Sequence, residues 1–219
     1  MSARLAEDLY SVLNSSLVYS FKKEPLPVFN ILAEKYISVR GIKSTDLPSN
    51  WSGVLSDLWS ASTDCEDTHY KVFDSFKAKL DQAHISEPHV IGELVDFFAD
   101  KYAALHKEDG GENIISKELL NFVYVFALEN HEGCPNDMAL LMPLSGLCAF
   151  GAMHCQYLIE DIEAYPEYYE DKTNITIVPF DGMETNQTNR LIGSVRLLTN
   201  LPTGGISEHH KISPANFLD

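Results

Sequence analysis

Histidine and cysteine side chains that could bind a metal ion gather between residues 131 and 155. His131 and Cys134 are separated by two residues, a gap that a zinc site accepts because both side chains can turn inward from one tight loop. His154 and Cys155 are adjacent, so on a helix their side chains diverge by about 100° and would hardly reach one ion together. The predicted metal site is therefore His131, Cys134 and His154, with zinc or iron as the ion, and no other cofactor is predicted.

The cysteines could also act as nucleophiles. The segment "GLCAFG" around Cys148 approaches the Gly-X-nucleophile-X-Gly elbow, but Phe150 occupies the position of the second glycine and no strand is predicted before it. We expect Cys148 inside an apolar helix, where burial disfavours the thiolate and the side chain serves packing. Cys134 precedes a predicted helix start, which favours a thiolate, whereas the nearby acids Glu132 and Asp137 oppose it.

Acidic and aromatic side chains alternate after residue 159. Glu160, Glu163 and Glu167 recur at the spacing of neighbours on a helix. A solvated helix end explains such a pattern without any function. The functional interpretation is a protein-binding face, in which tyrosines supply contact area and carboxylates pair with Arg or Lys. The predicted partner-binding residues are Glu160, Glu163, Tyr165, Glu167, Tyr168 and Tyr169.

The charge of the chain is strongly negative and unevenly distributed. The formal net charge is −16, and the 54 residues from Glu118 to Asp171 contain ten acids and no Lys or Arg. Such a surface repels nucleic acid and anionic lipid, since both are bound through clustered cations. We therefore expect no nucleic acid and no membrane as partners. A basic protein partner would be attracted, although acidity also serves solubility alone.

Residues 138–159 form a run of 22 residues without Asp, Glu, Lys or Arg. The run is long enough to raise the question of a membrane span, which needs about 20 residues. Its hydropathy is lowered by Pro143, Gly146, Gly151, His154 and Gln156. No cluster of Lys or Arg flanks the run, as a membrane helix would require on one side. The pattern favours a central helix of a protein core.

Hydrophobic periodicity predicts a mainly α protein of about seven helices with a small β hairpin near the C-terminus. The predicted helices are residues 2–21, 28–39, 49–62, 67–83, 86–106, 117–130 and 138–159, the last interrupted at Pro143. Residues 175–180 and 190–198 are rich in β-branched side chains and are predicted as the two strands of the hairpin. We expect one domain over residues 1–219, with a helical part at 1–165 and the hairpin and an irregular tail at 166–219.

Together these patterns predict a soluble, cytoplasmic protein. Four cysteines are too few and too unevenly spaced for a disulfide framework, and the N-terminus lacks the apolar stretch of a signal peptide. The first functional hypothesis is an acidic interaction module of inhibitor, immunity or adaptor type that binds a basic protein; a homo-oligomer is left open. The alternative is a small metal- or thiol-dependent enzyme centred on His131, Cys134 and His154.

Overall fold

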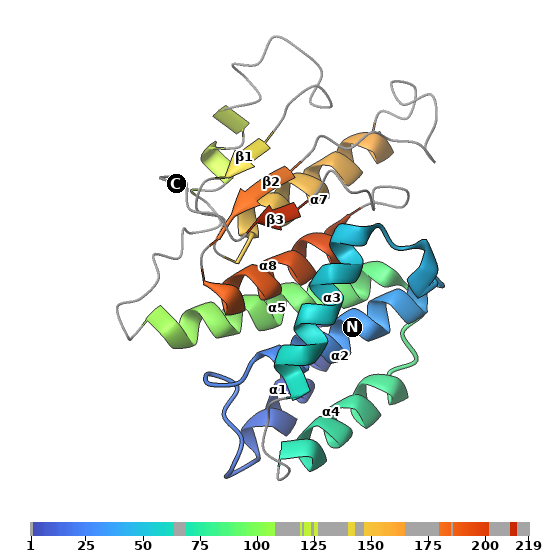
Figure 1. Cartoon of the computed structure of the whole chain (residues 1–219), viewed down its shortest axis with the longest axis vertical. Helices are drawn as coiled ribbons and strands as arrows, with labels where there is room; N and C mark the ends of the chain where they lie inside the picture. Colours follow the sequence, from blue (N-terminus) through green and yellow to red (C-terminus); the bar gives the residue numbers. More distant parts are fainter. Residues whose placement is uncertain are drawn as a thin grey trace. The chain divides into compact units, whose positions relative to one another are not determined.

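The structure is a computed structural model (Figure 1). It describes residues 2–63, 69–107, 119, 121–123, 125, 126, 140–142, 147–164, 180–184, 186–201 and 211–213. Its contacts divide the chain into two compact units, an N-terminal unit, Met1–Glu112, and a C-terminal unit, Asn113–Asp219. The predicted change of character at residue 165 does not coincide with this division, and whether both units fold as one domain stays a prediction.

The N-terminal unit is built from helices. They are α1 (Ser2–Asn14), α2 (Leu26–Arg40), the 3-10 helix η1 (Ser44–Asp46), α3 (Ser49–Thr63), α4 (Tyr70–Gln82) and α5 (Pro88–Lys107). Helix α2 packs against α3, α4 and α5, and α1 packs against α4 and α5. The first helix is shorter than the predicted 2–21, because the chain turns after Asn14 into the loop that leads to α2.

Helix α2 ends at Gly41, one residue beyond its last helical residue, Arg40. Gly41 adopts φ +66°, a left-handed conformation that glycine reaches without steric cost. Its N–H donates to the carbonyl of Ser38, and the N–H of Ile42 donates to the carbonyl of Ile37, both at 3.1 Å. These two bonds satisfy carbonyls that the end of the helix would otherwise leave unbonded.

Aromatic rings form much of the core of the N-terminal unit. The ring of Phe98 on α5 lies edge-on to Phe21 and to Phe76, with centroids 5.6 Å apart in both pairs. Phe21 also stacks near Phe29 of α2 at 6.3 Å. Each edge-to-face or offset ring pair adds about 0.5–1.5 kcal/mol of stability beyond that of burying its apolar area. These rings therefore connect the α1–α2 loop to helices α2, α4 and α5.

The C-terminal unit alternates strands and helices. Its elements are β1 (Leu140–Met142), α7 (Ala149–Ala164), β2 (Phe180–Met183), α8 (Gln187–Asn200) and β3 (Lys211–Ser213). The three strands form a parallel sheet in the order β1-β2-β3, with Leu140 opposite Phe180 and Asp181 opposite Lys211. Two parallel strands that pair directly need a long connection between them. Helix α7 lies in the connection from β1 to β2, and α8 lies in the connection from β2 to β3. Helix α7 packs against α8, and α8 packs against β3 (Figure 1).

The mainly α prediction is confirmed: the elements named above include seven α-helices and one 3-10 helix, and residues 119, 121–123, 125 and 126 are helical as well. A β element near the C-terminus is present, but the predicted hairpin is wrong because β2 and β3 pair in parallel. Residues 190–198 lie in α8 and not in a strand. Residues 191–200 are all buried, and a helix buried on every side lacks the polar face by which helices are identified in sequences. Of the other predicted strand, residues 175–180, only Phe180 lies within the described residues, at the start of β2.

The uncharged run of residues 138–159 is only partly helical. Its second half belongs to α7, as predicted, whereas Leu140–Met142 forms strand β1. A three-residue strand is too short to show a periodicity of its own. In the described part of the chain, no helix combines the length and the apolar character that crossing a bilayer requires.

Candidate functional site

Helix α7 carries a histidine and a cysteine that could take part in chemistry. His154 and Cys155 lie one turn into the helix and are both buried. Burial lowers the pKa of His154 from 6.5 to about 4, because the charged imidazolium loses its hydration. The side chain is therefore a neutral imidazole near pH 7. Cys155 is a buried thiol in the same turn.

Cys148 lies immediately before α7 and not inside a helix, which corrects the prediction. Its φ is +55°, and its carbonyl accepts the N–H of Ala152 at 3.1 Å, as expected at the start of a helix. Strand β1 ends at Met142 and α7 begins at Ala149, so Cys148 directly precedes a helix, as the nucleophile of an elbow does, but does not directly follow a strand. The thiol is buried and Phe150 still replaces the elbow glycine, so we keep Cys148 as a packing residue.

The predicted metal site is described for one of its three residues. His131 and Cys134 lie outside the described residues, and His154 lies in α7. Within the described ranges, no group of three His, Cys, Asp or Glu side chains is placed to hold a metal ion. The site at His131, Cys134 and His154 therefore stays a prediction.

The predicted acidic face begins on α7. Glu160 is exposed, and Glu163 occupies the last turn of the same helix three residues later. Positions three apart are neighbours on a helix surface. The other predicted partner-binding residues, Tyr165, Glu167, Tyr168 and Tyr169, lie outside the described residues.

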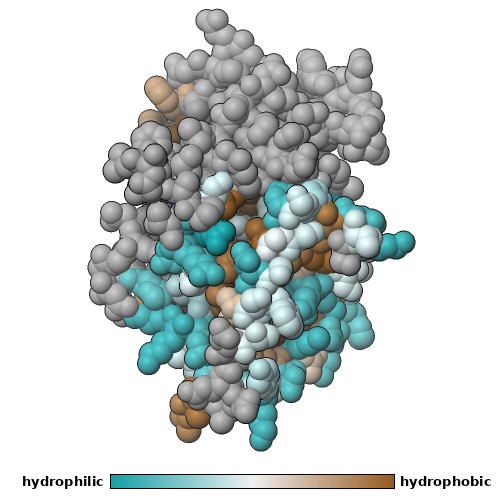
Figure 2. Space-filling view, viewed as in Figure 1, coloured by the Kyte–Doolittle hydropathy of each residue, from teal (hydrophilic) through white to brown (hydrophobic). Residues whose placement is uncertain are grey.

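A second exposed surface of the C-terminal unit was not singled out from the sequence. Residues 119, 121–123, 125 and 126 are helical, within the predicted helix 117–130 (Figure 1, yellow-green). Five large apolar side chains on it are exposed: Leu119 by 52%, Phe122 by 66%, Val123 by 45%, Phe126 by 58% and Val125 by 40%. We call Leu119, Phe122, Val123 and Phe126, which share one side of the helix, the apolar stripe; Val125 lies outside it. Figure 2 shows hydrophobic atoms at the upper left of the view, on the side where Figure 1 draws this segment.

The geometry of this helix fixes where the apolar stripe faces. At about 100° per residue, the four side chains fall within about 100° of arc. Asn121 lies on the opposite side of the helix, and its Oδ1 accepts a hydrogen bond from the Tyr157 hydroxyl of α7. The rings of Phe122 and Phe126 stack with centroids 6.3 Å apart. The spacing 119, 122, 123, 126 was visible in the sequence, but spacing alone does not tell an exposed stripe from a buried one.

Polar contacts hold α7 in place within its unit. The Gln156 side-chain amide donates to Oδ1 of Asn200 at 3.0 Å, and Asn200 in turn donates to the carbonyl of Arg196 at 2.8 Å. These bonds join α7 to the C-terminal end of α8. The helix that bears Glu160 is thereby supported by a buried helix.

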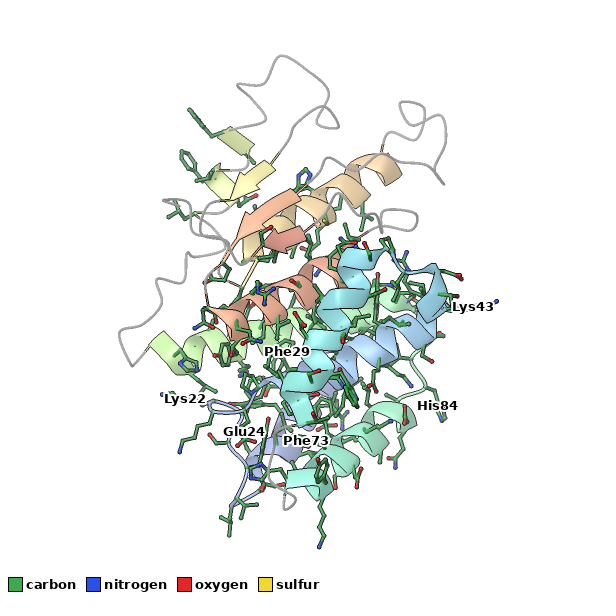
Figure 3. All side chains as sticks on the ribbon, in the orientation of Figure 1. Lys22, Glu24, Phe29, Lys43, Phe73 and His84 are labelled. Carbon is green, nitrogen blue, oxygen red and sulfur yellow. The ribbon has the colours of Figure 1, made fainter. Side chains whose placement is uncertain are left out.

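A separate polar cluster fixes the α1–α2 loop in the N-terminal unit. His69 lies with Nδ1 2.8 Å from Oε2 of Glu24 and with Nε2 3.1 Å from the carbonyl of Val18. The Tyr19 hydroxyl donates to the carbonyl of Glu24 at 2.7 Å. The Tyr19 ring lies edge-on to Phe73 of α4 with centroids 5.0 Å apart, and Figure 3 labels Glu24 and Phe73. Sequence reasoning missed this cluster, because its members are 45 and 51 residues apart. We regard it as structural, since each contact orders the loop.

Family models, curated proteins and solved structures gave no significant match to this chain. Function is therefore argued from charge, exposure and geometry. Among the described residues, the exposed face of α7 and the apolar stripe suit binding to another molecule.

Proposed function

We propose that this protein is an acidic interaction module, of inhibitor, immunity or adaptor type, whose C-terminal unit binds a basic protein partner. The main support for the proposal is one observation: the cation-free segment Glu118–Asp171 carries an exposed acid, Glu160, on helix α7, which a part-buried hydrogen bond from Gln156 to Asn200 joins to α8. We place the protein in the cytoplasm, in keeping with its four unevenly spaced cysteines.

The physical basis of the proposal is long-range attraction. An acidic surface without intervening cations raises the local concentration of a basic partner and speeds its encounter with the protein. This attraction is screened over about 10 Å at 0.1 M salt, so the complex should weaken as salt is added. Tyrosines of the predicted face, Tyr165, Tyr168 and Tyr169, would supply contact area beside the carboxylates.

The first test is affinity capture. The tagged full-length chain is exposed to a lysate of its source cells at low salt, and bound proteins are released by stepwise increases in salt. We expect one basic protein, in a stoichiometric amount, to be released as the salt concentration is raised. Recovery of no basic protein, or of a partner whose release does not depend on salt, would contradict the proposal.

The second candidate function is a metal- or thiol-dependent enzyme at His131, Cys134 and His154. The lowered pKa of His154 favours it, because a histidine binds metal in its neutral form. Protein purified without chelator should then contain zinc or iron, and a His131→Ala variant should lose it. A metal-free preparation with undiminished thermal stability would remove this candidate.

A further inference from the structure

We propose that the apolar stripe, Leu119, Phe122, Val123 and Phe126, is a docking site for an amphipathic helix of the partner that carries Lys or Arg beside its apolar face. This inference rests on the proposed function, which it extends by naming the contact surface and the structure of the bound segment. It is carried by the exposure of the four side chains and by the charge of the cation-free segment Glu118–Asp171, to which they belong.

The stripe has the spacing of a helix-binding surface. Positions i, i+3, i+4 and i+7 are the anchors that amphipathic helices use when they pack against one another. All four side chains are between 45% and 66% exposed, whereas large apolar residues of a monomer core are normally buried. The helix already contacts its own unit through Asn121 and Tyr157 on the opposite side.

Charge decides between the occupants that such a stripe could accept. A second copy of this chain would bring two segments of ten acids each together, and like charges at an interface disfavour association. An anionic membrane is disfavoured for the same reason. Lys117 lies directly before the segment, but no other cation occurs until Lys172. A partner helix with an apolar face and basic flanks would therefore pack on the apolar stripe and be attracted by the negative charge of the segment.

The probe is a synthetic amphipathic helix with leucines on one face and lysines on the other, compared with the same peptide carrying glutamates for lysines. Its binding to the full-length chain is measured by titration calorimetry. The lysine peptide should bind and the glutamate peptide should not. A Phe122→Ser/Phe126→Ser variant should bind the lysine peptide about tenfold more weakly, since exposed aromatics are frequent anchors of interfaces.

The matched control changes exposed apolar side chains of the N-terminal unit. Leu17 is 104% exposed and Trp59 58%, so a Leu17→Ser/Trp59→Ser variant loses similar apolar surface and should bind the lysine peptide as the original chain does. Circular dichroism of both variants checks that the helices are retained. If both variants lost the same affinity for the lysine peptide, or if neither lost any, the proposed docking site would be wrong.

Two variants distinguish an error in the docking site from an error in the proposed function. If a Glu160→Lys/Glu163→Lys variant loses the natural partner but Phe122→Ser/Phe126→Ser does not, the acidic module stands and the docking stripe is wrong. If the aromatic variant instead abolishes self-association seen by sedimentation, the occupant is a second copy and the inference is overturned.

Discussion

His154 shows how a single residue in α7 is shaped by its surroundings. From sequence it was a metal ligand with a packing interpretation beside it, and its place in the uncharged run indicated burial. The structure adds the consequence, a pKa lowered to about 4 by lost hydration. The position of Cys148 could not be predicted in the same way, because a φ of +55° is uncommon for a residue other than glycine and the sequence gives no sign of it.

The shift of His154 predicts a pH-dependent stability. In the unfolded chain its imidazole takes up a proton at its ordinary pKa of 6.5, but in the folded chain only at about 4. Between these values the unfolded state binds more protons, so the free energy of unfolding falls as the pH falls, by about 3 kcal/mol in total. Urea unfolding at several pH values should show that His154→Gln loses this part of the acid sensitivity.

The control for this prediction is His89→Gln, which removes an exposed imidazole of α5. It should leave the fall of stability between pH 6.5 and pH 4 nearly unchanged. Identical pH profiles for the original chain and His154→Gln would show that His154 is not desolvated in the folded protein.

At the scale of elements, local signals predicted the N-terminal unit well. The helices predicted at residues 28–39, 67–83 and 86–106 lie close to the observed bounds of α2, α4 and α5, because the spacing of their apolar residues is a local signal. The C-terminal unit was harder to predict because α8 is buried all round and its strands are three or four residues long. Non-local pairing defines such strands, and one sequence does not reveal it.

Two glycines give a test of these local rules with opposite outcomes. Gly41→Ala should lower the free energy of unfolding by about 1 kcal/mol, because alanine is strained at φ +66°. Gly53→Ala, within α3, should raise it by about 0.5–1 kcal/mol through helix propensity. An added Cβ meets no atom within 4 Å at either site. Urea midpoints that move in the same direction would contradict this assignment of backbone conformations.

On the scale of the whole molecule, charge is the property that the sequence states most directly. The net charge of −16 and the cation-free segment are facts of composition, and they disfavour nucleic acid as a partner, because binding its phosphates requires clustered cations. Exposure could not be predicted from the sequence, because the apolar stripe has the same periodicity as a core helix. The proposed interaction module therefore rests on two properties: charge, which the sequence gives directly, and the exposure of the apolar stripe, which only the structure gives.

The most direct measurement of the central claim is the affinity of the captured partner for two charge-reversal variants, as a function of salt. Glu160→Lys/Glu163→Lys changes the proposed face, and Asp74→Lys/Glu93→Lys makes the same net change at exposed acids of the N-terminal unit. We predict that the first variant binds about tenfold more weakly at low salt and with a reduced salt dependence, while the second binds nearly as the original chain. Equal affinities for all three proteins would contradict the claim that this acidic face binds the partner.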